Sequence, residues 1–198
     1  MNDVISRGRN HLQDIIATWT RERPDLDLSN YILAMFVMRL GRVVDDVYDG
    51  LCRKRFGISG ADMRVLFALR RAGKPYARRP TDLFRALLVT SGAITKQVDR
   101  LSKLGFVERL DDPTNSAGVL IALTGKGLKA ANTATDHLAK NSPIAPAIAN
   151  LKPTEREAVR RFVQQMLQDL EETLERERTA RIRTKGSRAR RRRLAARA

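Results

Sequence analysis

Residues 81–130 read TDLFRALLVTSGAITKQVDRLSKLGFVERLDDPTNSAGVLIALTGKGLKA, and their pattern is the most informative in the chain. Apolar residues in the first half of this stretch recur every three or four positions and are interrupted at Val89, Thr90 and Gly105, which predicts a short helix and then a helix over 91–104. The period then changes to two, so residues 106–110 and 119–123 are predicted to pair as a β-hairpin across the turn DDPTNSAG.

The helix predicted over 91–104 has two different faces. Ile94, Val98 and Leu101 form a narrow apolar stripe, which is typical of a helix that packs on a core along one side only. Such a helix can present its polar side to the major groove of DNA. The candidate DNA contacts on this side are Ser91, Gly92, Thr95, Lys96 and Arg100. Replacing both Lys96 and Arg100 by alanine is expected to abolish specific DNA binding with little loss of folding stability.

The order helix, short helix, turn, helix and hairpin predicts a mainly α protein that contains a winged helix-turn-helix domain. The hairpin is the wing, which reaches the DNA backbone or the minor groove. The candidate contacts in the wing are Arg109, Thr114, Asn115 and Ser116. Arg109 has two interpretations, because it can contact a phosphate or pair with Asp111.

Long helices are predicted on both sides of this domain. A helix over 4–20 and the linker RERPDLDL precede a helix over 30–56, with Ser29 as its cap and Gly57 at its end. After a helix from Thr124 to about residue 140, the pattern TERE begins the last helix at Thr154, with Glu157 completing a capping box. The expected segments are an N-terminal helix and linker (1–28), a dimerisation helix (29–57), the winged domain (58–141), a C-terminal dimerisation region (142–178) and a disordered arginine-rich tail (179–198).

The last helix has apolar residues at alternating three- and four-residue steps, which indicates a seam against another helix. The seam residues are Val159, Phe162, Val163, Met166, Leu170 and Leu174. Two partners remain open: the core of the same chain, or a second copy of the chain.

The 198 residues have a net charge of +16, which favours a polyanionic partner. Residues 176–198, called here the C-terminal basic segment, hold eleven basic residues and one acidic residue, a net +10, and leave +6 on residues 1–175. The segment is interpreted either as a solvated appendage or as a non-specific phosphate-binding arm, whereas a membrane anchor lacks an adjacent apolar face. Its candidate DNA contacts are Arg188, Arg190, Arg191, Arg192 and Arg193.

The run over 81–113, followed by VLIALTGKGLKA, resembles the MarR family of bacterial transcriptional regulators, and the resemblance covers roughly residues 64–130. It implies a homodimer whose terminal helices interlock, two winged domains on a palindromic operator, and release by a small phenolic or aromatic effector. Family members usually have arginine at the wing tip, where this chain has Ser116 and Ala117. We expect the C-terminal basic segment to replace part of that charge on DNA.

A leading helix with Trp19, followed by RPDLD, resembles a branch of the family that includes urate-responsive regulators. That resemblance makes Trp19 and Arg64 candidate ligand-pocket residues, although Arg64 stands where the branch has an aspartate, and Trp19 has a second interpretation as a core residue. Urate itself is therefore not expected as the ligand.

Several other classes of protein are disfavoured. The single Cys52 excludes an intramolecular disulfide and a thiolate metal cluster, and it is expected to be a buried structural residue; a redox sensor is the alternative. His11 and His137 lack metal or triad spacing, so no catalytic residue, metal or cofactor is predicted. With no leader or membrane span recognised, the expectation is a cytoplasmic, nucleoid-associated repressor. The alternative is a largely non-specific DNA-coating protein without a ligand response.

Overall fold

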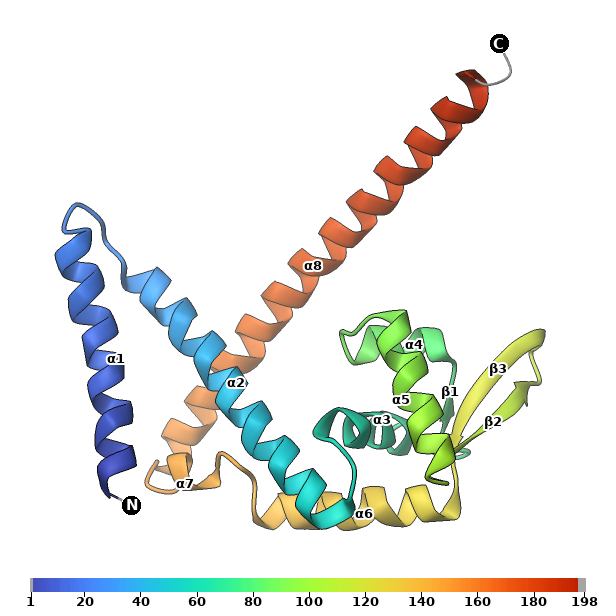
Figure 1. Ribbon diagram of the computed structural model, residues 1–198, viewed down its shortest axis with the longest axis horizontal. Coiled ribbons are helices and arrows are strands. Elements are labelled where there is room, and N and C mark those ends of the chain that lie inside the picture. The colour runs from blue at the N-terminus through green and yellow to red at the C-terminus, as the bar shows by residue number, and fades with distance from the viewer. Residues whose placement is uncertain (1, 196–198) are drawn as a thin grey trace. The chain divides into compact units, whose positions relative to one another are not determined.

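The computed structural model describes the backbone of residues 2–195 and the side chains of residues 12–177 and of Ala180. The chain divides into two compact units, residues 1–143 and residues 144–198, and each is described by itself (Figure 1). The first unit contains α1 (Asn2–Glu22), α2 (Ser29–Phe56), α3 (Gly60–Arg70), β1 (Ala77–Arg78), α4 (Pro80–Ala86), α5 (Ser91–Lys103), β2 (Val107–Asp112), β3 (Asn115–Leu123) and α6 (Gly125–Lys140). The second contains α7 (Ala145–Ile148) and α8 (Pro153–Ala195).

Helix α2 is the longest helix of the first unit, and its start differs from the prediction. Ser29 does not cap it; instead the Asp27 carboxylate accepts hydrogen bonds from the Ser29 backbone N–H (3.0 Å) and hydroxyl (2.6 Å). A carboxylate satisfies an N–H at a helix start as well as a serine hydroxyl does. The end is as predicted, because Gly57 takes a left-handed conformation with φ 69°.

Helices α3, α4 and α5 form the helix-turn-helix. The Ser59 hydroxyl accepts from the Asp62 N–H and the Thr90 hydroxyl accepts from the Ala93 N–H, so α3 and α5 each begin at a side-chain cap. Leu88 lies in the turn between α4 and α5 with φ 54°, and Gly105 follows α5 with φ 72°. The turn at Leu88 leads from α4 into α5, and the turn at Gly105 leads from α5 into β2.

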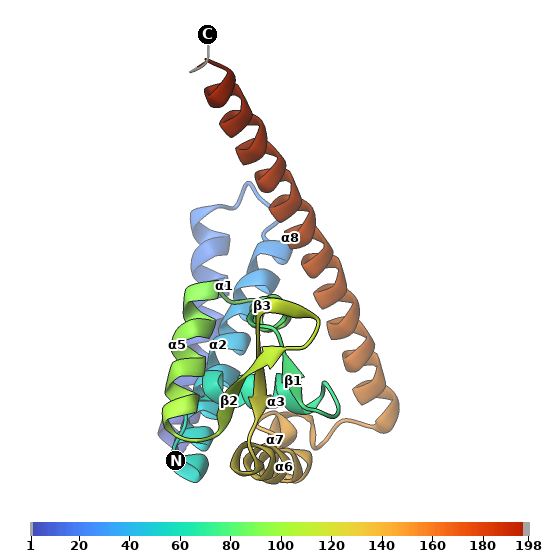
Figure 2. The same cartoon turned by 90° about the vertical axis from the view of Figure 1, so that its right-hand side faces the viewer.

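The sheet has three antiparallel strands in the order β1-β3-β2 (Figure 2). The predicted pairing is present, with Val107 opposite Leu123 and Leu110 opposite Leu120. The predicted eight-residue turn is wrong: β2 continues to Asp112 and β3 begins at Asn115, with an irregularity at 111–112. Ladder hydrogen bonds extend into polar residues that have no strand periodicity. The short β1, which pairs with β3, was not predicted because two residues show no period.

The core lies where α3, α5, α6 and the sheet meet. The predicted stripe of α5 is buried, since Ile94, Val98 and Leu101 are at most 2% exposed. Their partners include Met63, Val65, Leu66 and Leu69 of α3, Leu83 of α4, Val107 and Ile121 of the sheet, and Ala131 and Ala134 of α6. Because the core lies beneath one side of α5, the opposite side of this helix faces outward.

In the second unit, α8 begins one residue earlier than predicted, and its cap is different. The Lys152 N–H donates to the Glu155 carboxylate (2.7 Å), whereas Glu157, expected to complete the capping box, accepts from Arg160 (2.8 Å from its Nε). The glutamate that closes a capping box must lie three residues after the cap, and this residue is Glu155 once Lys152 is the cap. The short α7 was not predicted, because Pro143 and Pro146 interrupt any helical pattern in that connection.

Helix α8 continues to Ala195, where the sequence predicted a disordered tail from residue 179. Arginine and alanine have high intrinsic helix propensity, and a single Gly186 within an otherwise favourable run does not end a helix. The side chains of Arg188 and of the arginines at 190–193 lie outside the described residues. Within the described chain, no helix is long and apolar enough to span a membrane.

Candidate nucleic-acid interface

The outward side of α5 is the candidate surface for DNA. Ser91, Gly92, Thr95 and Lys96 are exposed along its first two turns. A side chain at position 92 would meet nothing within 4 Å, and the Thr95 hydroxyl donates to the Ser91 carbonyl (3.0 Å). Among the described contacts, the Lys96 ammonium has no ion pair. The first two turns of α5 therefore present small residues and one unpaired cation.

Arg100, the remaining candidate contact on α5, is held in an ion pair. Its Nη2 and Nε donate to the two carboxylate oxygens of Asp62 on α3, at 2.6 and 3.0 Å. The Asp62 side chain is only 3% exposed, and these hydrogen bonds raise the pKa of Arg100. Because a buried carboxylate without its partner is costly, the structure leads us to expect that removal of Arg100 lowers the folding stability.

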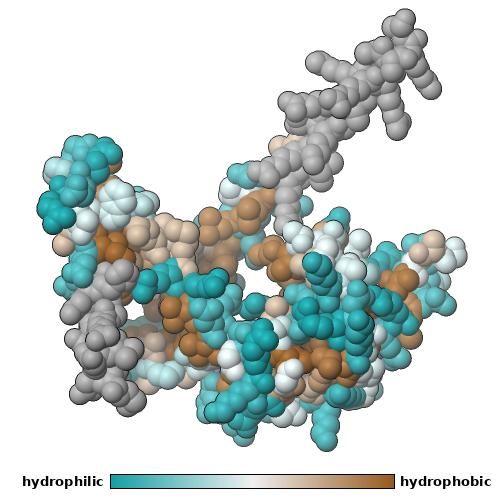
Figure 3. Space-filling view, in the orientation of Figure 1, coloured by the Kyte–Doolittle hydropathy of each residue, from teal (hydrophilic) through white to brown (hydrophobic). Residues whose placement is uncertain are grey.

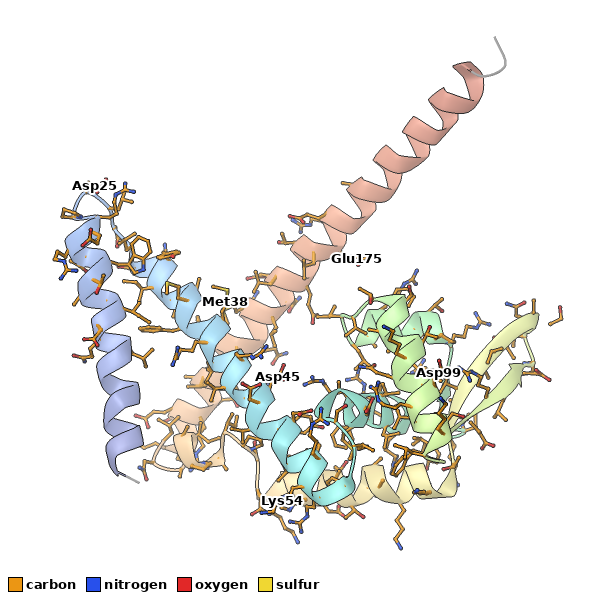
Figure 4. All side chains as sticks on the ribbon, viewed as in Figure 1. Asp25, Met38, Asp45, Lys54, Asp99 and Glu175 are labelled. Atoms are coloured by element: carbon orange, nitrogen blue, oxygen red, sulfur yellow. The ribbon has the colours of Figure 1, made fainter. Side chains whose placement is uncertain are left out.

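Of the two interpretations of Arg109 on β2, the pair with Asp111 is wrong, because the Arg109 Nη2 donates to Asp99 of α5 at 2.6 Å. The contact with a phosphate stays a prediction. Figure 4 labels Asp99 on α5, beside the strands. The sequence separates Asp99 and Arg109 by a helix end and a glycine turn, and only the packing of β2 against α5 brings them together.

The wing is fixed close to its tip by a buried carboxylate that the sequence did not single out. Asp112 accepts hydrogen bonds from Arg79 Nε (2.6 Å), the Thr114 N–H (2.9 Å) and the Thr114 hydroxyl (2.8 Å). These hydrogen bonds, with Arg79 the strongest, lower the pKa of Asp112 to about 2. Arg79 Nη2 also donates to the Thr114 hydroxyl (2.8 Å). Arg79 precedes Asp112 by 33 residues, so no local pattern reveals the pair.

The wing tip is polar and uncharged. Residues 113–118 are PTNSAG, and the Asn115 side chain accepts from the Ala117 N–H (3.3 Å). Thr114 and Ser116 are both exposed, and the Thr114 hydroxyl also donates to Asp112. A tip of this composition can form hydrogen bonds with a nucleic-acid backbone but offers it no positive charge.

The two candidate ligand-pocket residues do not meet within one chain. The Trp19 ring packs edge-on against Tyr31 (5.3 Å between centroids), whereas Arg64 pairs with Asp45 (2.8 Å), which Figure 4 labels on α2. Tyr31 and Asp45 are fourteen residues apart on one helix, which corresponds to about 21 Å. A groove of about 600 Å³ lies between α3 and α6, and neither Trp19 nor Arg64 lines it. Its lining includes Phe67, Arg70, Asn132 and Leu138.

Cys52 is 1% exposed and lies against Tyr48 in the core. Burial raises the pKa of its thiol, and burial likewise raises the pKa of the Tyr48 hydroxyl. A raised pKa leaves less of the thiol as the reactive thiolate, which favours the structural interpretation of Cys52. Among the residues described, no cluster of three His, Cys, Asp or Glu side chains could hold a metal ion.

Comparison with known proteins agrees with this geometry. Residues 56–116 match the model of the MarR family. The chain is 36% identical over 104 residues to the multiple antibiotic resistance protein MarR of Escherichia coli, covering 51% of this chain and 69% of that protein. It is 29% identical over 130 residues to the HTH-type transcriptional regulator PecS of Dickeya dadantii, covering 66% and 78%. The crystal structure of a cysteine-to-serine mutant of MarR from E. coli, complexed with operator DNA, has a TM-score of 0.56 and 28% identity over 72% of this chain and 99% of that one.

A helix held on a helical core with one side outward, followed by a small antiparallel sheet, defines a winged helix-turn-helix protein. The chain belongs to the MarR family of transcriptional regulators. The sequence-based prediction of this family and of the winged fold is thereby confirmed.

Proposed function

We propose that this protein is a transcriptional repressor that binds a palindromic operator as a homodimer, with α5 in the major groove. The observation that carries the proposal is the two-sided burial of α5: one stripe is sealed in the core, and Ser91, Gly92, Thr95 and Lys96 are exposed on the other side. The similarity to a MarR structure complexed with operator DNA supports DNA binding.

The roles of the basic residues differ from one another in this proposal. Lys96 contacts a base or a phosphate, and the small residues before it permit close approach of the helix to DNA. Thr114, Asn115 and Ser116 hydrogen-bond to the backbone from the wing. Arg100 and Arg109 hold α5 in place through Asp62 and Asp99.

The homodimer is supported by apolar side chains that each unit leaves in solvent. On α2, Leu33, Leu40, Val43 and Val47 share one stripe and are 48–61% exposed, and Figure 3 shows apolar patches along this helix. On α8 the predicted seam is likewise exposed, including Phe162, Val163, Leu170 and Leu174. Contiguous apolar stripes of this kind are typical of an interface. We propose that a second copy of the chain covers them.

The release of DNA by a small aromatic effector is part of the proposal, as the family resemblance implies. DNase footprinting on the region upstream of the protein's own gene, repeated with a panel of aromatic acids, tests both parts. The expected result is one protected palindrome with half-sites about one helical turn apart, and loss of protection with an active acid. Uniform protection of any duplex would instead identify a non-specific DNA-coating protein, which the +10 C-terminal basic segment favours.

A further inference from the structure

An acidic residue lies on a helix whose exposed side is otherwise basic. Asp99 follows Lys96 by three residues on α5 and precedes Arg100 and Lys103. Its side chain is 48% exposed, so its carboxylate is not buried away from an approaching duplex. Because DNA phosphates are negative, an acid in this position opposes binding unless it has another role.

The structure shows what the carboxylate contacts. Asp99 accepts a hydrogen bond from Arg109 at 2.6 Å, and Arg109 lies in the middle of β2, opposite Ile121 of β3. The ion pair therefore joins the second half of α5 to the base of the wing. The neighbouring residue Arg100 joins the same turn of α5 to Asp62 of α3. Asp99 thus connects α5 to the wing, and the adjacent Arg100 connects α5 to the helical core.

We propose that Asp99 is a positioning residue for DNA recognition, which fixes the wing relative to α5 through Arg109. This inference rests on the proposed function. A half-exposed ion pair adds little to folding stability, but it can select one orientation among several of similar energy. Two contact surfaces held in the right relative geometry bind one duplex together, whereas surfaces that move independently lose that advantage.

The proposal and simple electrostatics predict opposite results for one substitution. Asp99→Asn removes a negative charge near the phosphates, so electrostatics alone strengthens binding to every duplex. If Asp99 positions the wing, Asp99→Asn weakens binding to the specific site by about tenfold, comparable to the loss of one base contact, while binding to unrelated duplex is unchanged or tighter.

The experiment uses a duplex selected by the full-length protein from a random-sequence pool, and a scrambled duplex of equal composition. Fluorescence anisotropy at one salt concentration gives both Kd values for the wild type, Asp99→Asn, the exchanged pair Asp99→Arg with Arg109→Asp, and Glu108→Gln. Glu108→Gln is the matched control: it removes the same charge from an exposed neighbour on β2 for which the described contacts include no ion pair. Thermal melting confirms that each variant is folded.

The expected result is a tenfold lower specificity ratio in Asp99→Asn, a wild-type ratio in Glu108→Gln, and recovery of most of the ratio in the exchanged pair. An unchanged or raised ratio in Asp99→Asn overturns the positioning role, and so does an exchanged pair that stays as weak as the single variant. If the wild type selects no sequence and binds both duplexes equally, the proposed operator-binding function fails, and the inference fails with it.

Discussion

Lys96 and Arg100 lie one turn apart on α5, and the sequence presents them as equivalent contacts. The structure separates them, because Arg100 is bound to the buried Asp62 whereas Lys96 is unpaired in the described chain. The distinction depends on the Asp62 carboxylate of α3, because the sequence does not show that this side chain meets Arg100.

Single substitutions distinguish the two residues. Lys96→Ala is expected to weaken operator binding by about 1–3 kcal/mol if Lys96 contacts a base, while changing unfolding free energy by less than about 0.5 kcal/mol. Arg100→Ala is expected to lower the unfolding free energy by about 1–3 kcal/mol, because it leaves the Asp62 carboxylate buried without its partner. Urea unfolding and DNA titration of both variants measure these effects, and equal stability of the two variants would contradict the distinction.

Asp112 gives the wing a defined response to acid. Its pKa is about 2 in the folded protein, below the ordinary value of 3.8, because Arg79 and Thr114 stabilise the ionised form. A depressed pKa contributes stability that is fully present above about pH 4 and is lost as the pH falls toward 2.

Asp112→Asn isolates this contribution from those of other carboxylates. At pH 6 the variant is expected to melt at a lower temperature than the wild type, and the difference should shrink as the pH is lowered from 4 to 2. Melting curves across this range measure it. A difference that stays constant with pH would show that the charge of Asp112 is unimportant.

At the scale of elements, the junction between the wing and α6 has no room for a side chain. A Cβ at Gly127 would approach the Phe106 carbonyl oxygen at 2.0 Å, and this oxygen also accepts a hydrogen bond from the Thr124 N–H (3.1 Å). The start of α6 therefore packs directly on the backbone that leads into β2.

Gly127→Ala is expected to lower the unfolding free energy by about 1–3 kcal/mol, because α6 and the backbone at residue 106 must move apart. Gly125→Ala, two residues earlier in the same helix, is the control, since a Cβ there meets nothing within 4 Å. That variant is expected to be neutral or slightly more stable, because alanine favours helix. Chemical denaturation measures the unfolding free energy of both variants. Similar values for Gly127→Ala and Gly125→Ala would contradict the prediction.

Most elements of the winged domain can be predicted from hydrophobic periodicity and from the residues that start or end helices. The ends of α2 and α5 were predicted within one or two residues, because Gly57, Thr90 and Gly105 are local signals. The turn of the wing, the strand β1 and the short α7 were missed, because their hydrogen bonds join residues whose local patterns are weak. The cap of α8 was misplaced for a similar reason: Glu155 and Glu157 both fit the spacing of a capping pattern, depending on which residue begins the helix.

At the scale of the whole molecule, positive charge is divided between a body of +6 and a C-terminal basic segment of +10. The wing tip offers no charge. We expect the segment to supply phosphate contacts that add affinity for any duplex, while α5 supplies sequence preference.

Truncation after Glu175 tests this division. The truncated protein is expected to bind both specific and unrelated duplex more weakly, with a shallower dependence of log K on log salt; each lost phosphate contact lowers the slope by about 0.9. The ratio of specific to non-specific affinity should change little. Titrations at several salt concentrations measure the slope, and an identical slope in the two proteins would show that the segment does not contact DNA.

The order of most elements, the buried stripe of α5, the family and the position of the charge could be predicted from the sequence, because periodicity, caps and composition are local properties. The packing of the elements, in contrast, shows which charged side chains pair with one another. Asp62 meets Arg100, Asp99 meets Arg109 and Asp112 meets Arg79 across ten to thirty-eight residues of sequence. Ion pairs between elements depend on how helices and strands pack, so the pattern of the sequence shows the charges without showing which of them are already paired.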